Sequence, residues 1–168
     1  QEYEMREKHN AFASSVKELV FQNPNKKVNA LVFDISGKKA ATPLQFFISD
    51  IQLKTTQDKW QHLSLVKSAY QSDHAVLLGE QCGFSNPDNS ANWQLLLDAS
   101  TNIGDISHIR FTLGLPFNVN HLNPLTQESP LNLPTMFWGW QTGHKFLRLE
   151  MAAENDNWLI HLGSVGCK

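Results

Sequence analysis

Short segments in which apolar and polar residues alternate recur along most of the chain. In the segment 106–113, for example, Ile109, Phe111 and Leu113 fall on one parity. A period of two residues is typical of a strand with one buried face. Alternation or a short apolar run predicts strands over 28–34, 44–53, 75–78, 93–98, 106–113, 145–151 and 158–162. Because turn-forming residues separate these short strands, we expect an all-β fold, a single-domain β-sandwich with long loops.

The segment 44–53 changes parity partway along its length. Its apolar residues are even-numbered up to Ile48 and odd-numbered from Ile51. A strand can shift its buried parity only where an extra residue or a sharp twist interrupts the alternation. We therefore predict a bulge or twist near Ser49 and Asp50.

Helical spacing occurs only near the amino terminus. Phe12, Val16, Leu19 and Val20 recur at intervals of three and four residues, which predicts a short amphipathic helix or an ordered tail. We expect an N-terminal helical extension over 1–24 and a sandwich domain over 25–168.

The stretch 130–150 is rich in aromatic residues. It places two tryptophans, two phenylalanines and two glycines between a proline-bounded start and an alternating end. Aromatic side chains at strand spacing usually belong to a core. We accordingly expect core positions for Phe137, Trp138, Trp140 and Phe146.

Length and charge limit the classes of partner. A chain of 168 residues is expected to form one domain that buries roughly 70% of its unfolded surface. Its 14 Lys and Arg residues nearly balance 16 Asp and Glu residues, so no nucleic-acid partner is expected. No apolar run has the length of a membrane span. The first residues do not resemble a signal peptide, so an exported form is expected to have lost its signal peptide already.

Cys82 and Cys167 are the two cysteines of the chain. An even count, and a terminal Gly-Cys-Lys segment that needs an anchor, favour a disulfide bond between them. A disulfide that closes a loop of this size would stabilise the folded protein by about 4 kcal/mol or more in the chain-entropy model. Two free, buried thiols are the alternative.

Four ordered motifs resemble those of one known family. The motifs are Phe46 to Leu53, Leu113 to His121, Met136 to Glu150 and His161 to Cys167. They resemble those of the MbnP-like copper-binding proteins, the group of the CorA and MopE type of methane-oxidising bacteria, and the resemblance extends over about residues 28–168.

This resemblance implies a function as well as a fold. It implies an exported protein, periplasmic or at the cell surface, that binds copper as Cu(I) for uptake or storage. In such proteins two histidines and a tryptophan oxidised to kynurenine hold the copper. The implied partner is a dihaem cytochrome c peroxidase-like (MbnH-like) protein that carries out the oxidation. The family usually carries four cysteines, so one of its disulfide bonds is missing here.

The resemblance also implies a metal site built from Trp60, His62 and His121. Trp60 precedes His62 by two residues, as the family's tryptophan precedes its ligand, and residues i and i+2 of an extended segment share a face. His121 belongs to the family's asparagine-histidine loop. No local His-x-His pair exists, so the fold must assemble any site from these histidines: His9, His62, His74, His108, His121, His144 and His161.

Other interpretations of these residues remain open. Without a metal site, His62 would be a solvated loop histidine and Trp60 an aromatic residue at the rim of the core. His161 is more typical of a structural role. Five tryptophans also fit a β-sandwich module that binds carbohydrate or protein without metal.

Calcium binding and catalysis have weaker support in the sequence. The segments 86–89 and 154–157 are rich in oxygen donors, but they lack the spacing of an EF-hand loop, so ordinary turns are favoured over calcium sites. No Gly-x-Ser-x-Gly motif, phosphate-binding glycine loop or catalytic cysteine signature occurs. We do not expect an enzyme.

Overall fold

The computed structural model describes most of the chain, namely residues 15–20, 27–32, 44–55, 58–80, 91–99, 101, 106–139, 141–152 and 157–164. Its strands are β1 (Ser15–Val20), β2 (Lys27–Val32), β3 (Leu44–Thr55), β4 (Trp60–His62), β5 (Ala75–Gly79), β6 (Gln94–Asp98), β7 (Ile106–Leu113), β8 (Phe137–Gly139), β9 (Gly143–Ala152) and β10 (Asn157–Gly163). The helical elements are α1 (Phe117–Asn120) and two single 3₁₀ turns, η1 (Pro124–Thr126) and η2 (Pro134–Met136). The all-β expectation is confirmed.

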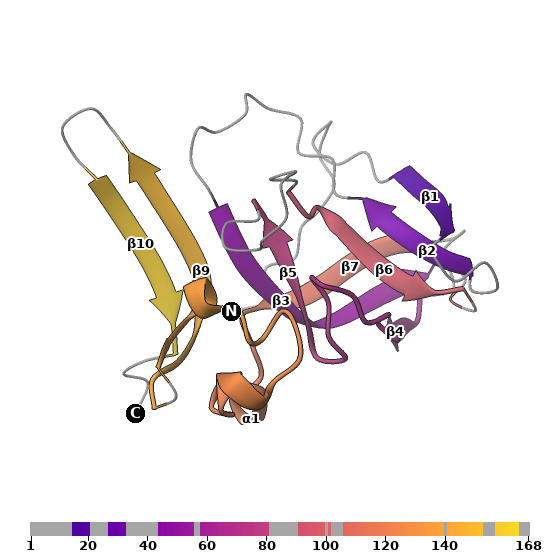
Figure 1. Cartoon of the computed structure of the whole chain (residues 1–168). Helices are drawn as coiled ribbons and strands as arrows, with labels where there is room; N and C mark the ends of the chain where they lie inside the picture. The colour runs from indigo at the N-terminus through magenta and orange to yellow at the C-terminus, as the bar shows by residue number, and fades with distance from the viewer. Residues whose placement is uncertain are drawn as a thin grey trace.

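The strands form two sheets (Figure 1). The smaller sheet has the order β1-β2-β6, and the larger has the order β10-β9-β3-β4, with β5 and β7 also paired to β3 and β8 paired to β9. β3 is the central strand of the larger sheet. Its first half pairs with β5 and β9, whereas its second half pairs with β4 and β7.

The predicted irregularity in β3 is confirmed. The register with β7 shifts between Ser49 and Gln52, and Asp50 has a φ of 53°. Aspartate is one of the few residues that adopt this left-handed conformation readily. The shift changes which side chains of β3 face the interior, so that Ile48 and Ile51 both reach the core.

One core cluster lies between the two sheets. Leu95 and Leu97 of β6 pack against the larger sheet there, on Ile48, Ile51, Leu53, Val76 and Leu78. Burial of apolar surface between two sheets is the main source of stability for a β-sandwich. The smaller sheet is held to the larger one by this layer.

A second core cluster covers the opposite face of the larger sheet. Phe47 of β3 and Leu77 of β5 pack there against the segment 114–136, through Leu115, Val119, Leu131, Leu133 and Met136. β5 is therefore buried on both faces. This double burial explains why 75–78 is a continuous apolar run and not an alternating one.

Two sequence predictions need correction. Residues 15–20 do not form part of an N-terminal helix, because they form β1 and pair with β2 over their whole length. A window this short does not separate the two periodicities, and pairing with β2 decides the conformation. Trp138, expected in the core, is 42% exposed, since it lies on the short strand β8 at an edge of the sheet.

Several predictions concern residues outside the described part of the chain. These are the disulfide between Cys82 and Cys167, the oxygen-rich turns at 86–89 and 154–156, the first 14 residues of the expected helical extension, and Trp140. Among the described residues, no helix is both long and apolar enough to cross a membrane.

Candidate metal centre

Three strands present a row of polar and aromatic side chains on one exposed face. β4 and β7 flank the second half of β3, and residues that pair directly across an antiparallel sheet point to the same side. We call this surface the β4-β3-β7 face. Its two cross-strand rows are Trp60–Lys54–His108 and His62–Gln52–Arg110.

The opposite side of the same strands belongs to the core. Leu53 is 3% exposed and packs, with Ile109, into the layer between the sheets. Burial of these two positions requires the residues on either side of them to point to solvent. The alternation in β3 and β7 thus places Lys54, His108 and Arg110 on the exposed side.

Trp60 is the centre of the aromatic contacts on this face. Its ring centroid lies 6.5 Å from that of His108, with the ring planes at 61°. The guanidinium carbon of Arg110 lies 4.2 Å from the Trp60 centroid, and Lys54 Nζ lies 5.9 Å from it. Cations at these distances are attracted by the face of an indole ring.

His62 contacts the neighbouring strand through its ring. Its Nε2 lies 3.0 Å from Gln52 Nε2. Gln52 Oε1 accepts hydrogen bonds from Arg110 Nε and Nη2, at 2.9 and 2.5 Å. A chain of polar contacts therefore crosses all three strands, from β7 through β3 to β4.

The charged groups near Trp60 are partly paired. Lys54 forms an ion pair with Asp58, which lies in the turn before β4. The hydrogen bond from Lys54, and then its charge, lower the pKa of the Asp58 carboxyl below its ordinary value. The Asp58 side chain is 84% exposed, so this pair contributes little to stability.

His108 also lies on the β4-β3-β7 face, although no sequence pattern assigned it to the candidate site. It is exposed, its Nδ1 lies 3.1 Å from Ser107 Oγ, and it matches no motif of the family. Its parity in the strand 106–113, opposite to that of Ile109, was the available signal. Parity shows that His108 points outward, but it does not show which strand lies beside it.

His121 lies in a different part of the molecule. It follows α1, and its ring packs on Phe117 with centroids 4.6 Å apart. In Figure 1, α1 and β4 are well separated. The described contacts of His62 and His121 share no residue, whereas those of Trp60 include His108.

Asn120, the neighbour of His121 in the motif, is buried and hydrogen-bonds to other parts of the fold. It is 1% exposed, its Oδ1 accepts from the backbone N–H of His144 at 2.7 Å, and its Nδ2 donates to Ser164 Oγ at 2.7 Å. Gly143 has a φ of 78°, and a Cβ at that position would lie 2.7 Å from Asn120 Nδ2. Asn120 thus connects α1 to the start of β9 and the end of β10.

His144 is buried and contacts two backbone carbonyls. Its Nε2 lies 2.7 Å from Leu131 O and its Nδ1 lies 3.1 Å from Asn120 O. Both ring nitrogens are occupied by the protein itself, so His144 is not available to a metal ion.

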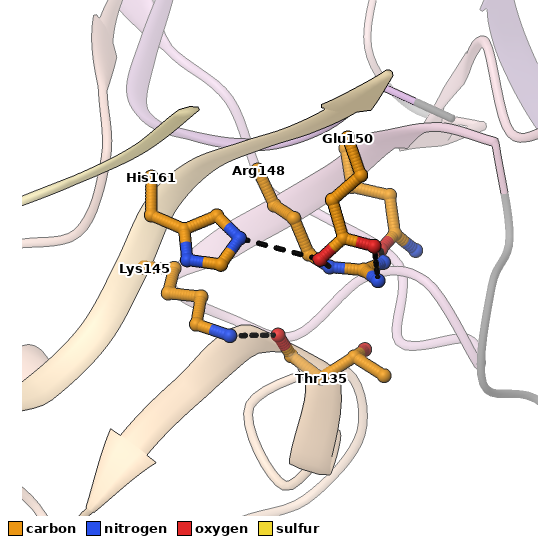
Figure 2. A network of polar contacts seen from close by, with 6 residues as sticks. Thr135, Lys145, Arg148, Glu150 and His161 are labelled. Carbon is orange, nitrogen blue, oxygen red and sulfur yellow. Dashed lines mark hydrogen bonds and ion pairs between the residues drawn. The ribbon is translucent and has the colours of Figure 1, made fainter. Parts of the chain in front are cut away.

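A second polar network joins β3, β9 and β10 (Figure 2). Arg148 donates to both carboxylate oxygens of Glu150, through Nε at 2.8 Å and through Nη2. Its Nη1 donates to Gln45 Oε1 at 3.0 Å. His161 Nε2 lies 3.3 Å from Glu150 Oε1, so His161 is part of this network.

The charges of the second network are largely satisfied within it. Burial disfavours the charged form of Glu150, but the hydrogen bonds and charge of Arg148, together with those of His161, outweigh burial and lower the pKa of Glu150. Lys145 donates to Thr135 O at 3.0 Å, and burial, then repulsion by Arg148, lower the pKa of Lys145. The network holds β9 and β10 against β3.

No described group of three or more His, Cys, Asp or Glu side chains gathers in a way that holds a metal ion. The donors on the β4-β3-β7 face are instead His62 and His108, with Trp60 beside them. The indole N–H of an unmodified tryptophan is a donor only and provides no lone pair to a metal. Imidazole nitrogens suit copper, zinc, iron and nickel.

Comparison with known proteins shows to which family this chain is similar. The sequence profile of the MbnP family matches residues 12–168. A solved structure, MbnP from Methylosinus trichosporium, superposes with a TM-score of 0.57 and 21% sequence identity, over 84% of this chain and 54% of the other. This chain therefore spans about half the length of that relative. No curated protein matches.

Proposed function

Because this chain belongs to the MbnP family, we propose that it binds copper, as Cu(I), on the β4-β3-β7 face, for copper uptake or storage. In this proposal His62 and His108 are the imidazole ligands and Trp60, in its kynurenine form, is the third. The observation that supports the site is that Trp60 lies near both histidines: it is two residues from His62 in β4, and its ring centroid is 6.5 Å from that of His108.

The chemistry of the residues fits this assignment. Two neutral imidazoles provide nitrogen donors that suit copper. Kynurenine carries a free aromatic amine, which provides the lone pair that the indole of Trp60 lacks. The two histidines are exposed, so an ion reaches them without opening the core.

The choice of second histidine differs from the sequence hypothesis. That hypothesis paired His62 with His121, on the basis of the asparagine-histidine loop. The described contacts support His108, because β4 and β7 flank the same residues of β3. Asn120, the other residue of that loop, has a structural role that explains its presence without copper.

The remaining parts of the proposal rest on the resemblance to the family. We propose export to the periplasm or cell surface, and oxidation of Trp60 by a dihaem cytochrome c peroxidase-like partner. Trp60 is 38% exposed, as a residue modified by a separate protein must be. Neither ligand binding nor storage requires this chain to be an enzyme.

Metal analysis and intact mass of the protein, isolated from its natural source, test this proposal. We expect bound copper and a mass gain that peptide mapping assigns to Trp60. A protein that contains no copper, and takes up none from a Cu(I) buffer, would contradict the proposed function. Unmodified recombinant protein is expected to bind Cu(I) more weakly, through the two histidines.

One observation favours a second candidate function. Trp158 and Leu159 of β10 are 60% and 62% exposed, and Trp138 is 42% exposed. Exposed aromatic side chains stack on sugar rings and anchor protein partners. Binding of carbohydrate or protein that survives removal of copper, and is lost when Trp158 is replaced by alanine, would support this alternative.

A further inference from the structure

His62 already has a hydrogen-bond partner for its Nε2 atom on the β4-β3-β7 face. The ring nitrogen Nε2 lies 3.0 Å from the amide nitrogen of Gln52. Which of the two groups donates depends on the orientation of the Gln52 amide and on the tautomer of His62. The contacts of Arg110 determine both.

Arg110 fixes the orientation of the Gln52 amide. Its Nε and Nη2 both lie within hydrogen-bond distance of one Gln52 atom, at 2.9 and 2.5 Å. A guanidinium group has donors and no acceptor, so the atom that faces it must be the amide oxygen. The amide NH₂ group then points to His62 and donates to its Nε2.

The tautomer of His62 follows from this donation. A nitrogen that accepts a hydrogen bond carries no proton, so in neutral His62 the proton is on Nδ1. Neither ring nitrogen is then free to bind a metal, because Nε2 shares its lone pair with Gln52 and Nδ1 is protonated. A metal ion gains the Nε2 lone pair only when the Gln52 amide leaves.

The same arginine also covers Trp60. Its guanidinium carbon lies 4.2 Å from the centroid of the Trp60 ring, while two of its nitrogens are held by Gln52 Oε1. Gln52 and Arg110 therefore restrict both members of the Trp60-x-His62 pair at once. The same Gln52 amide thus contacts His62 through its nitrogen and Arg110 through its oxygen.

We propose that Gln52 and Arg110 form a latch that occupies His62 and Trp60 in the metal-free protein, and that copper binding displaces the Gln52 amide from His62 Nε2. This inference rests on the proposed function. An interaction present only in the metal-free state weakens binding by its own free energy. Loss of one neutral hydrogen bond of ordinary strength corresponds to about a 2- to 10-fold change in affinity.

The variant Gln52→Leu tests the latch. Leucine has a similar size but neither the donor nor the acceptor of the Gln52 amide, and the variant keeps the net charge of the protein. In competition with a chromophoric Cu(I) chelator, we expect Gln52→Leu to bind Cu(I) about 2- to 10-fold more tightly than the wild type. Gln141→Leu, a change at an exposed turn between β8 and β9, is the matched control and is expected to leave the affinity unchanged.

A second measurement needs no copper. In ¹⁵N spectra of the metal-free protein, we expect the His62 signals of a ring protonated on Nδ1, with a hydrogen-bonded Nε2 that shifts in Gln52→Leu. A ring protonated on Nε2, or a Gln52→Leu variant with equal or weaker Cu(I) binding, would overturn the latch. Gln52→Met repeats both measurements if leucine disturbs the pairing of β3. If the wild type binds no Cu(I) while the spectra show the expected tautomer, the proposed function fails and the contact itself stands.

Discussion

The rings of Trp60 and His108 lie 6.5 Å apart, centroid to centroid, although their strands do not pair with each other. They are neighbours because Lys54 of β3 pairs with Trp60 on one side and with His108 on the other. One residue of the central strand thus links two segments that are distant in sequence. The candidate copper site depends on this pairing.

Replacing His108 with alanine is expected to weaken Cu(I) binding by more than about 100-fold. Loss of a residue that only hydrogen-bonds to a metal ligand lowers metal affinity by about 10- to 100-fold, and loss of the ligand itself is expected to lower it further. His62→Ala is expected to have an effect of similar size. Cu(I) affinities from chelator competition measure both, and circular dichroism checks the fold.

Two further variants serve as comparisons for this series. His74→Ala, an exposed histidine outside the β4-β3-β7 face, is expected to leave the affinity unchanged, and so is His121→Ala. Loss of binding in His121→Ala with normal binding in His108→Ala would instead support the pair His62 and His121.

Asn120→Ala is expected to lower the free energy of unfolding by about 1–3 kcal/mol, because it leaves the buried backbone N–H of His144 without its acceptor. Urea denaturation measures the loss. Asn118→Ala, an exposed position in the same helix, is the control, with an expected change below about 0.5 kcal/mol. Equal effects of the two substitutions would show that Asn120 does not connect α1 to β9.

Gly79→Ala is expected to destabilise the protein by about 2 kcal/mol or more. Gly79 has a φ of 109°, and a Cβ there would overlap the carbonyl oxygen of Leu44 in the neighbouring strand. At Gly139, by contrast, a Cβ would meet only Thr142 Oγ1 at 3.8 Å, so Gly139→Ala is expected to cost less than about 1 kcal/mol. Thermal and urea unfolding of the two variants test this difference, and similar stabilities would contradict the close approach at Gly79.

Glu150→Gln is expected to lower stability at pH 7 by about 1–3 kcal/mol, because it removes the carboxylate that pairs with Arg148. The pKa of Glu150 is lowered in the folded protein, so its carboxylate stabilises the fold above the unfolded-state pKa. That stabilisation is lost as the pH falls through the folded-state pKa, which lies below 4.5.

The difference between wild type and Glu150→Gln should therefore shrink as the pH falls below 4.5. Urea unfolding at neutral and acidic pH measures it. Glu128→Gln is the control, since Glu128 pairs with Lys67 on the surface with its side chain 71% exposed, and exposed pairs contribute little. A difference for Glu150→Gln that is constant with pH would contradict the role of its charge.

The sequence alone was informative wherever a local pattern had one physical solution. Alternation and short apolar runs predicted β2, β3, β5, β6, β7, β9 and β10, but not the three-residue strands β4 and β8. The parity change in 44–53 predicted the irregularity after Ser49. The spacing of Trp60 and His62 also predicted that they share one face, because residues i and i+2 of a strand point to the same side. The same reasoning was wrong for 15–20, where six residues fit either period and only β2 makes the choice.

Tertiary structure alone decided which strands became neighbours. His108 shares no motif with Trp60 and reaches it because β3 pairs with β4 along one edge and β7 along the other. Asn120 belongs to a motif, but its hydrogen bonds with His144 and Ser164 join residues 24 and 44 positions apart, which only the folded chain brings together. A sequence records which face a residue takes within its own strand, whereas the partner across the sheet depends on long-range pairing that no local period encodes.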